Sequence, residues 1–428
     1  MQETAQPSGR EVAIIGFGTA GVNAAISLRT AGYEGVIRVF SNTGTLPYSP
    51  ILTSYYAGGR KGYDECFPWT AEELADLHLT VMQNCPVREL DPAAHAIRTP
   101  QGEFIYAKCL IATGATPMPY GFPGVEGEPD FVPFALRTMD DATRLREALE
   151  DPACERMLVS GASMVALKML EACLDQGKQV TLVGMNPHVL DFNALPPAAE
   201  RFERGLLAKG AQLRLGQTIK SVRRIGADEG EGAGRLEVTF STGEHDVFDG
   251  IAVAHGMASN MGFIKDGALE IDRALVVDDY MRTSDPDVYA AGDVAQGLEL
   301  ISGQKRIVGI WKNAAVQGAC AGRAIAAEMA GGALAPELAF GGGIATNTIA
   351  VDGTLFISAG TMEVTENRFV EVREMDDMTV VYVWQNGEGE GAASRLVGFN
   401  LASDTDEEGG VAYDTGAMLT LRIEAGCR

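Results

Sequence analysis

A glycine-rich turn near the amino terminus carries the clearest chemical signal in the sequence. Gly16, Gly18 and Gly21 follow the G-x-G-x-x-G spacing. The turn comes directly after the apolar run Glu11–Ile15 and before Thr19–Ala31, where apolar residues recur at helical spacing. The first glycine permits a tight turn, the second lets the backbone approach a pyrophosphate, and the third allows close helix packing. Free N–H groups at the helix N-terminus then face the phosphates, so the turn predicts a dinucleotide site.

Two βαβ units must position this chemistry. The strand Gly35–Phe40 completes the first unit. A second unit consists of the strand Met157–Ser160, the turn Gly161–Ala166, the helix Ser163–Gln176 and the strand Gln179–Val183. The order strand, glycine turn, helix, strand occurs twice, which predicts an α/β fold with two Rossmann-like nucleotide-binding domains.

The second turn departs from the pattern. Gly161 keeps the tight turn, but Ser163 replaces the glycine that lets the backbone approach a pyrophosphate. At the end of the next strand, where an acid grips the adenosine ribose in such folds, the residue is Gly184, and no Arg or Lys cluster is present for a 2′-phosphate. Two readings remain open: weak NAD(H) binding with fewer contacts, or a domain kept as a scaffold. The residues of a possible NAD site are Gly161, Ser163, Met164 and Gly256.

Composition excludes several classes of function. The chain has 428 residues, which predicts two or three domains. Its formal net charge of −24 makes nucleic acid an unsuitable partner, and it favours a basic docking partner over an acidic carrier. Seven scattered cysteines without a C-x-x-C pair predict no metal site within the chain and a reducing compartment. No stretch has the length of a membrane span, so we expect a soluble, cytoplasmic protein.

Three further motifs identify a family resemblance. Leu110–Ala115 is a strand that ends in an Ala-Thr-Gly turn, Tyr289–Asp293 is a strand that ends in Gly-Asp, and Trp311–Gly318 opens an alanine-rich helix. With the first turn, these motifs resemble the two-dinucleotide-binding-domain flavoproteins of the pyridine nucleotide-disulfide oxidoreductase superfamily. The resemblance covers essentially the whole chain.

The resemblance implies FAD as cofactor. In that family the first turn holds the FAD pyrophosphate, the Ala-Thr-Gly segment lines the site, and the aspartate after the glycine bonds the ribityl chain. Asn42 and Thr43 replace the acid often found after the second strand, and either side chain can still bond a ribose hydroxyl. The implied FAD residues are Gly16, Gly18, Thr19, Ala20, Gly21, Asn42, Thr43, Pro47, Val87, Ala112, Thr113, Gly114, Gly292, Asp293 and Ala314.

The branch of the family follows from a missing cysteine. Gly44 stands where disulfide-reducing members carry a redox cysteine, so no thiolate nucleophile is available there. The segment Leu46–Ser54 is similar instead to ferredoxin and rubredoxin reductases, with Ser54 in place of their lysine and Gly309 in place of their usual glutamate. No catalytic residue is certain; the candidates near the flavin are Thr53, Ser54 and Trp311.

The chain also resembles FAD subunits of multi-subunit aldehyde and phenylglyoxylate oxidoreductases. This resemblance implies an FAD-dependent NAD(P)H oxidoreductase that exchanges electrons with a redox partner protein, such as an iron–sulfur subunit. One alternative is an NAD-independent electron-relay or scaffold subunit. Another is a flavin oxidase or dehydrogenase acting on a small substrate over a face left open by Gly44 and Gly309. His255 could gate the flavin, or it could be a hydrogen-bonded structural histidine.

The expected domain boundaries follow the motifs. An FAD-binding domain is predicted for residues 1–118 and 245–334, and an NAD(P)-binding-like domain for 119–244. Residues 335–428 form a predicted α+β domain with an antiparallel sheet, through which the chain would form an oligomer or join a complex. Its strands are expected at Thr346–Val351, Phe369–Glu374, Thr379–Trp384 and Arg395–Leu401. The sequence also predicts a hairpin tip at Ala227–Gly234 and an acidic loop at Asp404–Gly410.

Overall fold

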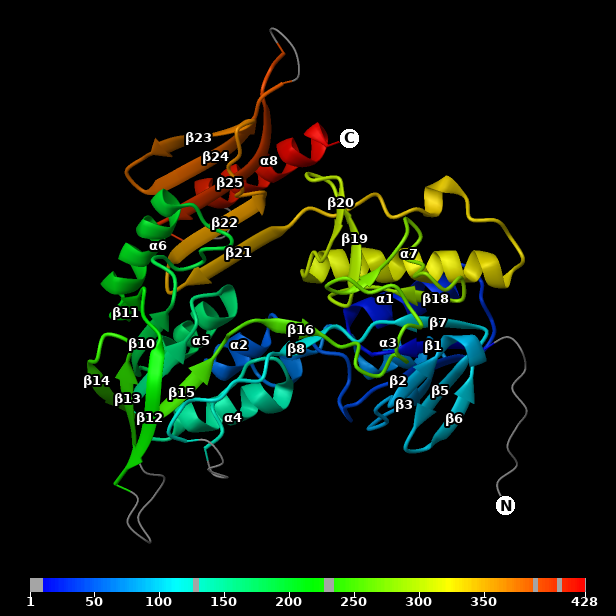
Figure 1. The fold of residues 1–428 in the computed structure, drawn as a ribbon, viewed down its shortest axis with the longest axis horizontal. Coiled ribbons are helices and arrows are strands. Elements are labelled where there is room, and N and C mark those ends of the chain that lie inside the picture. The colour runs from blue at the N-terminus through cyan, green and yellow to red at the C-terminus, as the bar shows by residue number, and fades with distance from the viewer. Residues whose placement is uncertain (1–10, 126–130, 227–234, 388–391, 406–409, 428) are drawn as a thin grey trace. The chain divides into compact units, whose positions relative to one another are not determined.

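The chain forms two units in a computed structural model that describes residues 11–125, 131–226, 235–387, 392–405 and 410–427 (Figure 1). Both units are built from segments that alternate along the sequence. Unit 1 contains Met1–Ser49, Phe67–Thr116 and Ala258–Ile344, and unit 2 contains Pro50–Cys66, Pro117–Met257 and Ala345–Arg428.

Unit 1 is built on a five-stranded parallel sheet in the order β18-β7-β1-β2-β3. The strand β1 lies at its centre, paired with β2 and β7, and its four residues are buried. A continuous apolar run suits a strand that is covered on both faces. The strands are β1 (Val12–Ile15), β2 (Ile37–Phe40), β3 (Thr80–Met82), β7 (Lys108–Ile111) and β18 (Val288–Ala290).

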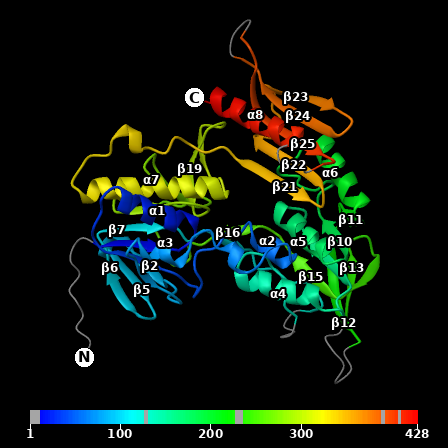
Figure 2. The same ribbon diagram turned by 180° about the vertical axis from the view of Figure 1, so that it is seen from behind.

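Two helices and a small antiparallel sheet cover the two faces of this sheet (Figures 1 and 2). Helices α1 (Thr19–Thr30) and α7 (Trp311–Met329) lie side by side on one face. On the other face, Phe104 of the small sheet packs edge-on against Phe40 with ring centroids 5.3 Å apart. That sheet contains β4 (Glu89–Asp91), β5 (Ala96–Thr99) and β6 (Gly102–Ile105). Unit 1 also contains α3 (Ala71–Ala75), β17 (Leu275–Val276), β19 (Ala295–Glu299), β20 (Gln304–Arg306) and two short 3-10 helices at Pro92–Ala94 and Pro336–Leu338.

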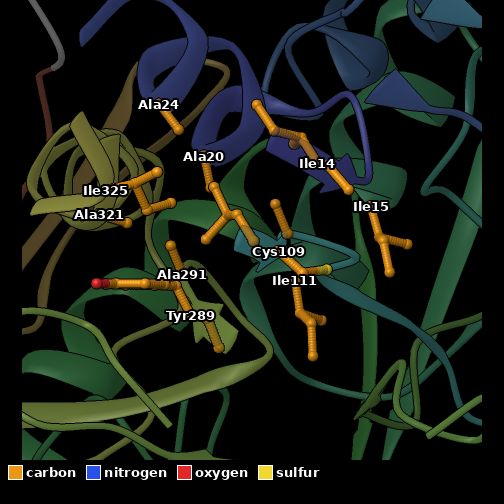
Figure 3. Close-up of a cluster of buried hydrophobic side chains, with 14 of the residues drawn as sticks. Ile14, Ile15, Ala20, Ala24, Cys109, Ile111, Tyr289, Ala291, Ala321 and Ile325 are labelled. Carbon is orange, nitrogen blue, oxygen red and sulfur yellow. The ribbon is translucent and has the colours of Figure 1, made fainter. Parts of the chain in front are cut away.

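Small residues allow α1 and α7 to lie close together. A Cβ added at Gly318 would lie 2.1 Å from the carbonyl oxygen of Ala20, and one at Gly322 would lie 2.4 Å from that of Ala24. Figure 3 shows side chains from α1, α7 and strands β1, β7 and β18 gathered in one buried cluster, which includes Ala20, Ala24 and Ala321. The core therefore fixes the position of α7 against α1.

Unit 2 contains a second parallel sheet in the order β11-β10-β9-β15. It consists of β9 (Arg156–Ser160), β10 (Gln179–Gly184), β11 (Gln212–Leu215) and β15 (Gly250–Val253), and it is accompanied by α4 (Met139–Glu150), α5 (Met164–Asp175) and α6 (Pro196–Ala208). An antiparallel sheet follows β11, formed by β12 (Ile219–Ile225), β13 (Arg235–Phe240) and β14 (His245–Phe248). The short helix α2 (Thr53–Ala57) packs against α4 and α5.

The carboxyl-terminal part of unit 2 is a five-stranded antiparallel sheet with one helix. Its order is β21-β22-β25-β24-β23, and α8 packs against β22 and β25. The elements are β21 (Thr346–Val351), β22 (Thr354–Gly360), β23 (Arg368–Glu374), β24 (Met378–Gln385), β25 (Arg395–Ser403) and α8 (Val411–Gly426).

Buried polar side chains join this sheet to α6. The amide of Asn400, which is fully buried, accepts a hydrogen bond from the N–H of Leu195 at 2.7 Å and donates one to the carbonyl of Asn193 at 2.8 Å. Arg201 of α6 donates to the carbonyl of Asp376 at 2.7 Å and also pairs with Asp404. Since such buried groups are costly to leave unpaired, they fix the sheet against α6.

The predicted α/β fold with two Rossmann-like βαβ units and an antiparallel carboxyl-terminal sheet is confirmed. The four carboxyl-terminal strands lie within one or two residues of their expected bounds, while β22 and α8 were not expected. The division into three domains stays a prediction. The contacts separate two units, and residues 245–257 belong to unit 2 because β15 pairs with β9 there. The expected hairpin tip at Ala227–Gly234, and part of the expected acidic loop at Asp404–Gly410, lie outside the described residues.

Candidate functional site

The first glycine turn has the geometry of an anion cradle. Gly16 has φ +107°, and a Cβ there would lie 2.2 Å from the carbonyl oxygen of Ala112. A Cβ at Gly21 would lie 2.2 Å from the carbonyl oxygen of Gly16, so both positions require glycine. A Cβ at Gly18 would meet no protein atom within 4 Å. The turn is therefore closed toward the protein and open at Gly18.

The N-terminus of α1 is unblocked. Gly18 is its N-cap residue, and no side chain makes a capping hydrogen bond there. The first turn, which contains Thr19 and Ala20, carries no acidic residue. Free N–H groups and the positive end of the helix dipole favour a phosphate group at this position. The residues present thus fit the pyrophosphate of a dinucleotide.

Gly292 and Asp293 lie beside this turn. Gly292 has φ +83°, and a Cβ there would lie 3.4 Å from that of Ala20 and 3.5 Å from that of Ala314. Its N–H donates to Gln317 Oε1 at 2.9 Å. The segment after β18 therefore lies between the first turns of α1 and α7, and the structure brings together Gly16, Gly18, Gly21, Gly292 and Ala314.

Asn260 holds the Ala-Thr-Gly turn. Its side-chain amide donates to the carbonyl of Thr113 at 2.9 Å, and its backbone N–H donates to that of Gly114 at 2.9 Å. The hydroxyl of Thr113 donates in return to the carbonyl of Asn260 at 2.8 Å. Ala112, at the start of the turn, bonds through its N–H to the carbonyl of Ile15 at 2.7 Å. Asn260 is a functional residue that no motif in the sequence marks.

The segment after β2 is ordered by its own polar groups. The N–H of Thr43 donates to the hydroxyl of Ser41 at 3.2 Å, and Asn42 is exposed. Pro47 is buried, and Val87 packs against the core of unit 1. Asn42 is therefore accessible to a ligand, and the roles of Pro47 and Val87 in an FAD site stay predictions.

Gly44 and Gly309 do not leave equal space. A Cβ at Gly44 would lie 2.9 Å from the side-chain nitrogen of Asn84, so that side chain occupies the place of the absent cysteine. A Cβ at Gly309 would lie 3.6 Å from Asp293 Oδ1, which is ordinary contact. Of the two positions that the oxidase alternative invoked, Gly309 leaves room as it stands, and Gly44 leaves room once the exposed Asn84 side chain moves aside.

Two tryptophans stack at the start of α7. Trp311 lies over Trp69 with ring centroids 5.8 Å apart and planes 26° apart. Trp69 precedes α3, which Thr70 caps by accepting from the N–H of Glu73 at 3.1 Å. Trp69 was missed because a lone tryptophan in a loop gives no periodic signal. Trp311 is therefore held by a second aromatic ring rather than immersed in the core.

The other two candidates near the flavin, Thr53 and Ser54, belong to unit 2 and are buried. The hydroxyl of Thr53 donates to the carbonyl of Pro50 at 2.7 Å, and that of Ser54 donates to the carbonyl of Ile51 at 3.2 Å. Both bonds support the first turn of α2. Their role near a flavin stays a prediction.

The second glycine turn is partly blocked by its own residues. Gly161 has φ +120°, and a Cβ there would lie 2.4 Å from the carbonyl oxygen of Ala254. Ser163 caps α5, because its hydroxyl accepts from the N–H of Ala166 at 3.4 Å. One free N–H of the helix start is thereby taken, whereas α1 keeps all of its own. Met164 opens α5 and Gly256 follows β15 with φ +102°.

Gly184 is closely packed. A Cβ at this position would lie 2.8 Å from that of Ala162 and 3.4 Å from a methyl group of Leu215. A side chain in the place of the missing ribose-binding acid therefore requires a shift of the turn. The sequence alone suggested only that an acid was absent, and the structure shows that none fits without rearrangement.

His255 lies in a polar and aromatic setting within unit 2. Its Nε2 is 2.8 Å from the hydroxyl of Ser160, and its ring packs edge-on against Tyr120 at 5.7 Å between centroids. Desolvation lowers the pKa of His255 below its ordinary value. The side chain is thus a neutral, hydrogen-bonded imidazole at neutral pH, which favours the structural reading.

The cysteines show no redox site. Six of the seven are buried, and burial raises the pKa of five thiols, that of Cys320 to about 11. The thiols with raised pKa are Cys66, Cys109, Cys154, Cys173 and Cys320. All seven are free in the structure, and the described residues contain no cluster of side chains able to hold a metal ion.

We expect each Cys→Ser variant to keep flavin reduction within about twofold of the parent rate, because the sequence has no C-x-x-C pair and burial raises the pKa of five of the seven thiols, which disfavours the reactive thiolate. The reduced protein should show no charge-transfer band between a thiolate and the flavin. Stopped-flow absorbance during anaerobic reduction measures both quantities. Such a band, lost in one Cys→Ser variant, would mean that a thiolate reaches the flavin.

The profile of the family described as pyridine nucleotide-disulphide oxidoreductases matches residues 10–318. A rubredoxin-NAD(+) reductase of Ectopseudomonas oleovorans is 31% identical over 287 residues, which cover 66% of this chain and 71% of the relative. Subunit epsilon of the NADH-dependent phenylglyoxylate dehydrogenase of Aromatoleum evansii is 27% identical over 388 residues, 90% of this chain and 87% of the relative.

A solved structure supports the fold. The water-forming NADH oxidase from Lactobacillus brevis superposes with a TM-score of 0.80 at 20% identity, over 96% of this chain and 91% of that one. None of the helices in the described part of the chain is long and apolar enough to cross a membrane. The combination of two βαβ units, an open glycine turn and a profile match over most of the sequence leads to one conclusion: the chain belongs to the pyridine nucleotide-disulphide oxidoreductase family.

Proposed function

We propose that unit 1 binds FAD at the open end of α1 and that the chain transfers electrons between NAD(P)H and a redox partner protein. Proteins of this family bind FAD and NAD(P)H, and the chain is an FAD-dependent oxidoreductase. The observation that carries the proposal is the uncapped N-terminus of α1 at Gly18, where an added Cβ meets nothing. The turn has no space for side chains at Gly16 and Gly21, and it leaves space at Gly18 beside free N–H groups. This arrangement fits a pyrophosphate.

The residues around the turn have separate tasks. N–H groups of Gly18, Thr19 and Ala20 would bind the pyrophosphate, and Asn42 or Thr43 would bond the adenosine ribose. Asp293 would accept a hydrogen bond from a ribityl hydroxyl. FAD, when bound, supplies the exchange between two-electron and one-electron carriers. The protein contributes orientation, through the contacts that hold Gly292 between α1 and α7.

The second Rossmann domain is proposed to bind nicotinamide nucleotides weakly. Ser163 occupies one N–H of the α5 start, and the close approach of Ala162 to Gly184 leaves no place for a ribose-binding acid. Relatives named rubredoxin-NAD(+) reductase and NADH oxidase favour NADH as the electron donor or NAD as the acceptor. Under the scaffold alternative and the NAD-independent relay alternative, this domain binds no nicotinamide nucleotide.

Anaerobic titration with NADH and NADPH, followed by flavin absorbance, tests this proposal. We expect both nucleotides to reduce the flavin with modest discrimination between them. The reason is that the sequence offers neither a carboxylate to bind the 2′-hydroxyl of NADH nor a cation to bind the 2′-phosphate of NADPH. Ser163→Gly should tighten both by about tenfold, since one N–H becomes free for a charged pyrophosphate, worth about 1.4 kcal/mol. Ser163→Ala is the matched control: it frees the same N–H but keeps the Cβ in the path of the pyrophosphate, so its gain should be smaller.

Three outcomes decide between the readings. Tight NADH binding with strong discrimination in the parent would mean that another group holds the ribose. If neither nucleotide reduces the flavin in the parent or in Ser163→Gly, the domain is a scaffold and the relay alternative holds. Oxygen consumption that matches NADH oxidation without any partner protein would support the oxidase alternative.

We further propose that the redox partner docks beside the stacked tryptophans. The β19–β20 hairpin leads into α7 and exposes Lys305 and Arg306, and neither forms an ion pair with another described residue. Ile307 is also exposed, at 38%. In a chain of net charge −24, these two free cations suit an acidic carrier, such as the rubredoxin or ferredoxin in the names of relatives. A relative named subunit epsilon of a phenylglyoxylate dehydrogenase favours another subunit of a larger complex as the partner, and we propose that an iron–sulfur subunit takes this place.

A further inference from the structure

The edge strand β23 of the carboxyl-terminal sheet carries an unused hydrogen-bonding edge. It pairs with β24 on one side, and no other described strand pairs with its outer side. The strand is seven residues long and contains neither proline nor lysine. Native sheets commonly protect their edges with proline, bulges or charged side chains, and four of the seven β23 side chains are charged. Its open edge therefore suits only a strand that places opposite charges across from these residues.

The backbone hydrogen bonds show which residues face outward. At one end of the strand the N–H of Met375 donates to the carbonyl of Met378 at 2.8 Å, and at the other the carbonyl of Asn367 accepts from Asn386 at 2.9 Å. Hydrogen-bonding groups alternate along an antiparallel strand, so the odd-numbered residues bond to β24. Val370, Val372 and Glu374 therefore turn their N–H and C=O groups to the open side.

Three of the seven side chains of this strand are apolar, and the four charged ones balance each other. Phe369 is 44% exposed, Val370 37% and Val372 42%. Two arginines and two glutamates leave the strand with no net charge, whereas the whole chain carries −24. Repulsion between two copies of so acidic a chain is weakest at a neutral segment.

We propose that β23 pairs with β23 of a second copy of this chain, in antiparallel register centred on Val372. The two-fold axis then places Val372 opposite its own counterpart and Glu371 opposite the partner's Arg373. Phe369 falls opposite Met375, which is 43% exposed, and Arg368 opposite Asp376. Cross-strand pairs of opposite charge and of apolar residues each contribute roughly 0.2–1 kcal/mol. The sequence of this edge is thus self-complementary.

Other registers are less favourable. Centred on Glu371, the pairing would set Glu371 against its own counterpart and Arg373 against Phe369. Centred on Arg373, it would set two arginines against each other. Like charges directly opposite each other are destabilising. The outward N–H and C=O groups of residues 370, 372 and 374 can bond to those of a second strand only where even-numbered residues lie opposite even-numbered residues. The Val372 register meets this condition, and it also places opposite charges across from each other.

The association should be weak and dependent on concentration. A single strand pair buries less surface than the roughly 1,200–2,000 Å² of stable complexes, so we expect a reversible dimer. Each copy already holds its own Glu371 against Arg373 at 2.8 Å, and Trp384 donates to Glu371 at 2.9 Å. These bonds within one copy compete with the cross-strand pairing of the same two groups, so the charged pairs add little net free energy, which is a further reason for a weak dimer.

Charge exchange within the strand tests the register. The full-length flavoprotein is measured by sedimentation velocity across a concentration series. Glu371→Arg and Arg373→Glu should each weaken self-association by at least about tenfold, because each places like charges opposite. The double variant Glu371→Arg/Arg373→Glu restores opposite charges and should recover the dimer. Flavin content and the denaturation midpoint confirm that each variant folds.

Mixing the two single variants gives the sharpest result. The Glu371→Arg chain then presents two arginines to the two glutamates of the Arg373→Glu chain, so a heterodimer should form where neither variant associates alone. A parent that stays monomeric throughout the series would overturn the proposal. So would single variants that dimerise as the parent does, or a double variant that does not recover.

Discussion

Gly18→Val should abolish FAD binding and leave a folded, colourless protein. Gly18 is extended, with φ −87° and ψ −168°, so valine adopts the backbone conformation without strain. An added Cβ meets no protein atom within 4 Å, and the fold should therefore tolerate it. The same space is what a pyrophosphate needs beside the N–H groups of α1, and a branched side chain would fill it. Flavin absorbance of the purified protein, with and without added FAD, measures the loss.

Gly341→Val is the matched control. Gly341 is also exposed, lies in unit 1, and an added Cβ meets nothing within 4 Å. This variant should keep a full complement of FAD, released by heat as FAD rather than FMN. If Gly18→Val retains its flavin, the pyrophosphate lies elsewhere and the proposed site is incorrect. A parent protein that takes up no FAD would contradict the whole assignment.

Reversal of the two hairpin cations should slow electron transfer to an acidic partner. We expect Lys305→Glu/Arg306→Glu to lower kcat/KM for an acidic rubredoxin or ferredoxin by about 10- to 100-fold at low ionic strength. Electrostatic steering contributes rate factors of this order, and the double change replaces two attractive charges by two repulsive ones. The difference from the parent should shrink as salt rises, because salt screens exposed charges. Reduction of the flavin by NADH should stay unchanged.

The control must carry the same change in net charge. Lys220 and Arg273 are exposed, and neither forms an ion pair with another described residue, so Lys220→Glu/Arg273→Glu makes the chain equally more acidic. If this control slows the partner reaction as much as the hairpin variant does, the effect belongs to net charge and not to a docking surface. Equal rates for parent and hairpin variant at low salt would place the partner at another surface.

Local sequence determined the elements that hold the nucleotide. The spacing of Gly16, Gly18 and Gly21 follows from backbone geometry: two of these positions exclude any side chain, and the third opens to solvent. The apolar run before the turn predicts a buried strand, and the helical spacing of apolar residues after it predicts a helix that packs against the core. The absence of a cysteine at Gly44 was equally visible, since chemistry that requires a thiolate cannot be supplied by glycine.

Tertiary structure alone decided which distant residues support the site. Asn260 bonds to Thr113 and Gly114 across 147 and 146 positions of sequence, and Trp69 stacks on Trp311 from a loop. No periodicity encodes such contacts, because each depends on where separate elements meet. The close packing at Gly184 is of the same kind: the sequence showed a missing acid, and only the approach of Ala162 showed that a replacement has no room. Likewise, β23 was expected as a strand, but its place at the open edge of the sheet follows from the order in which five strands pair.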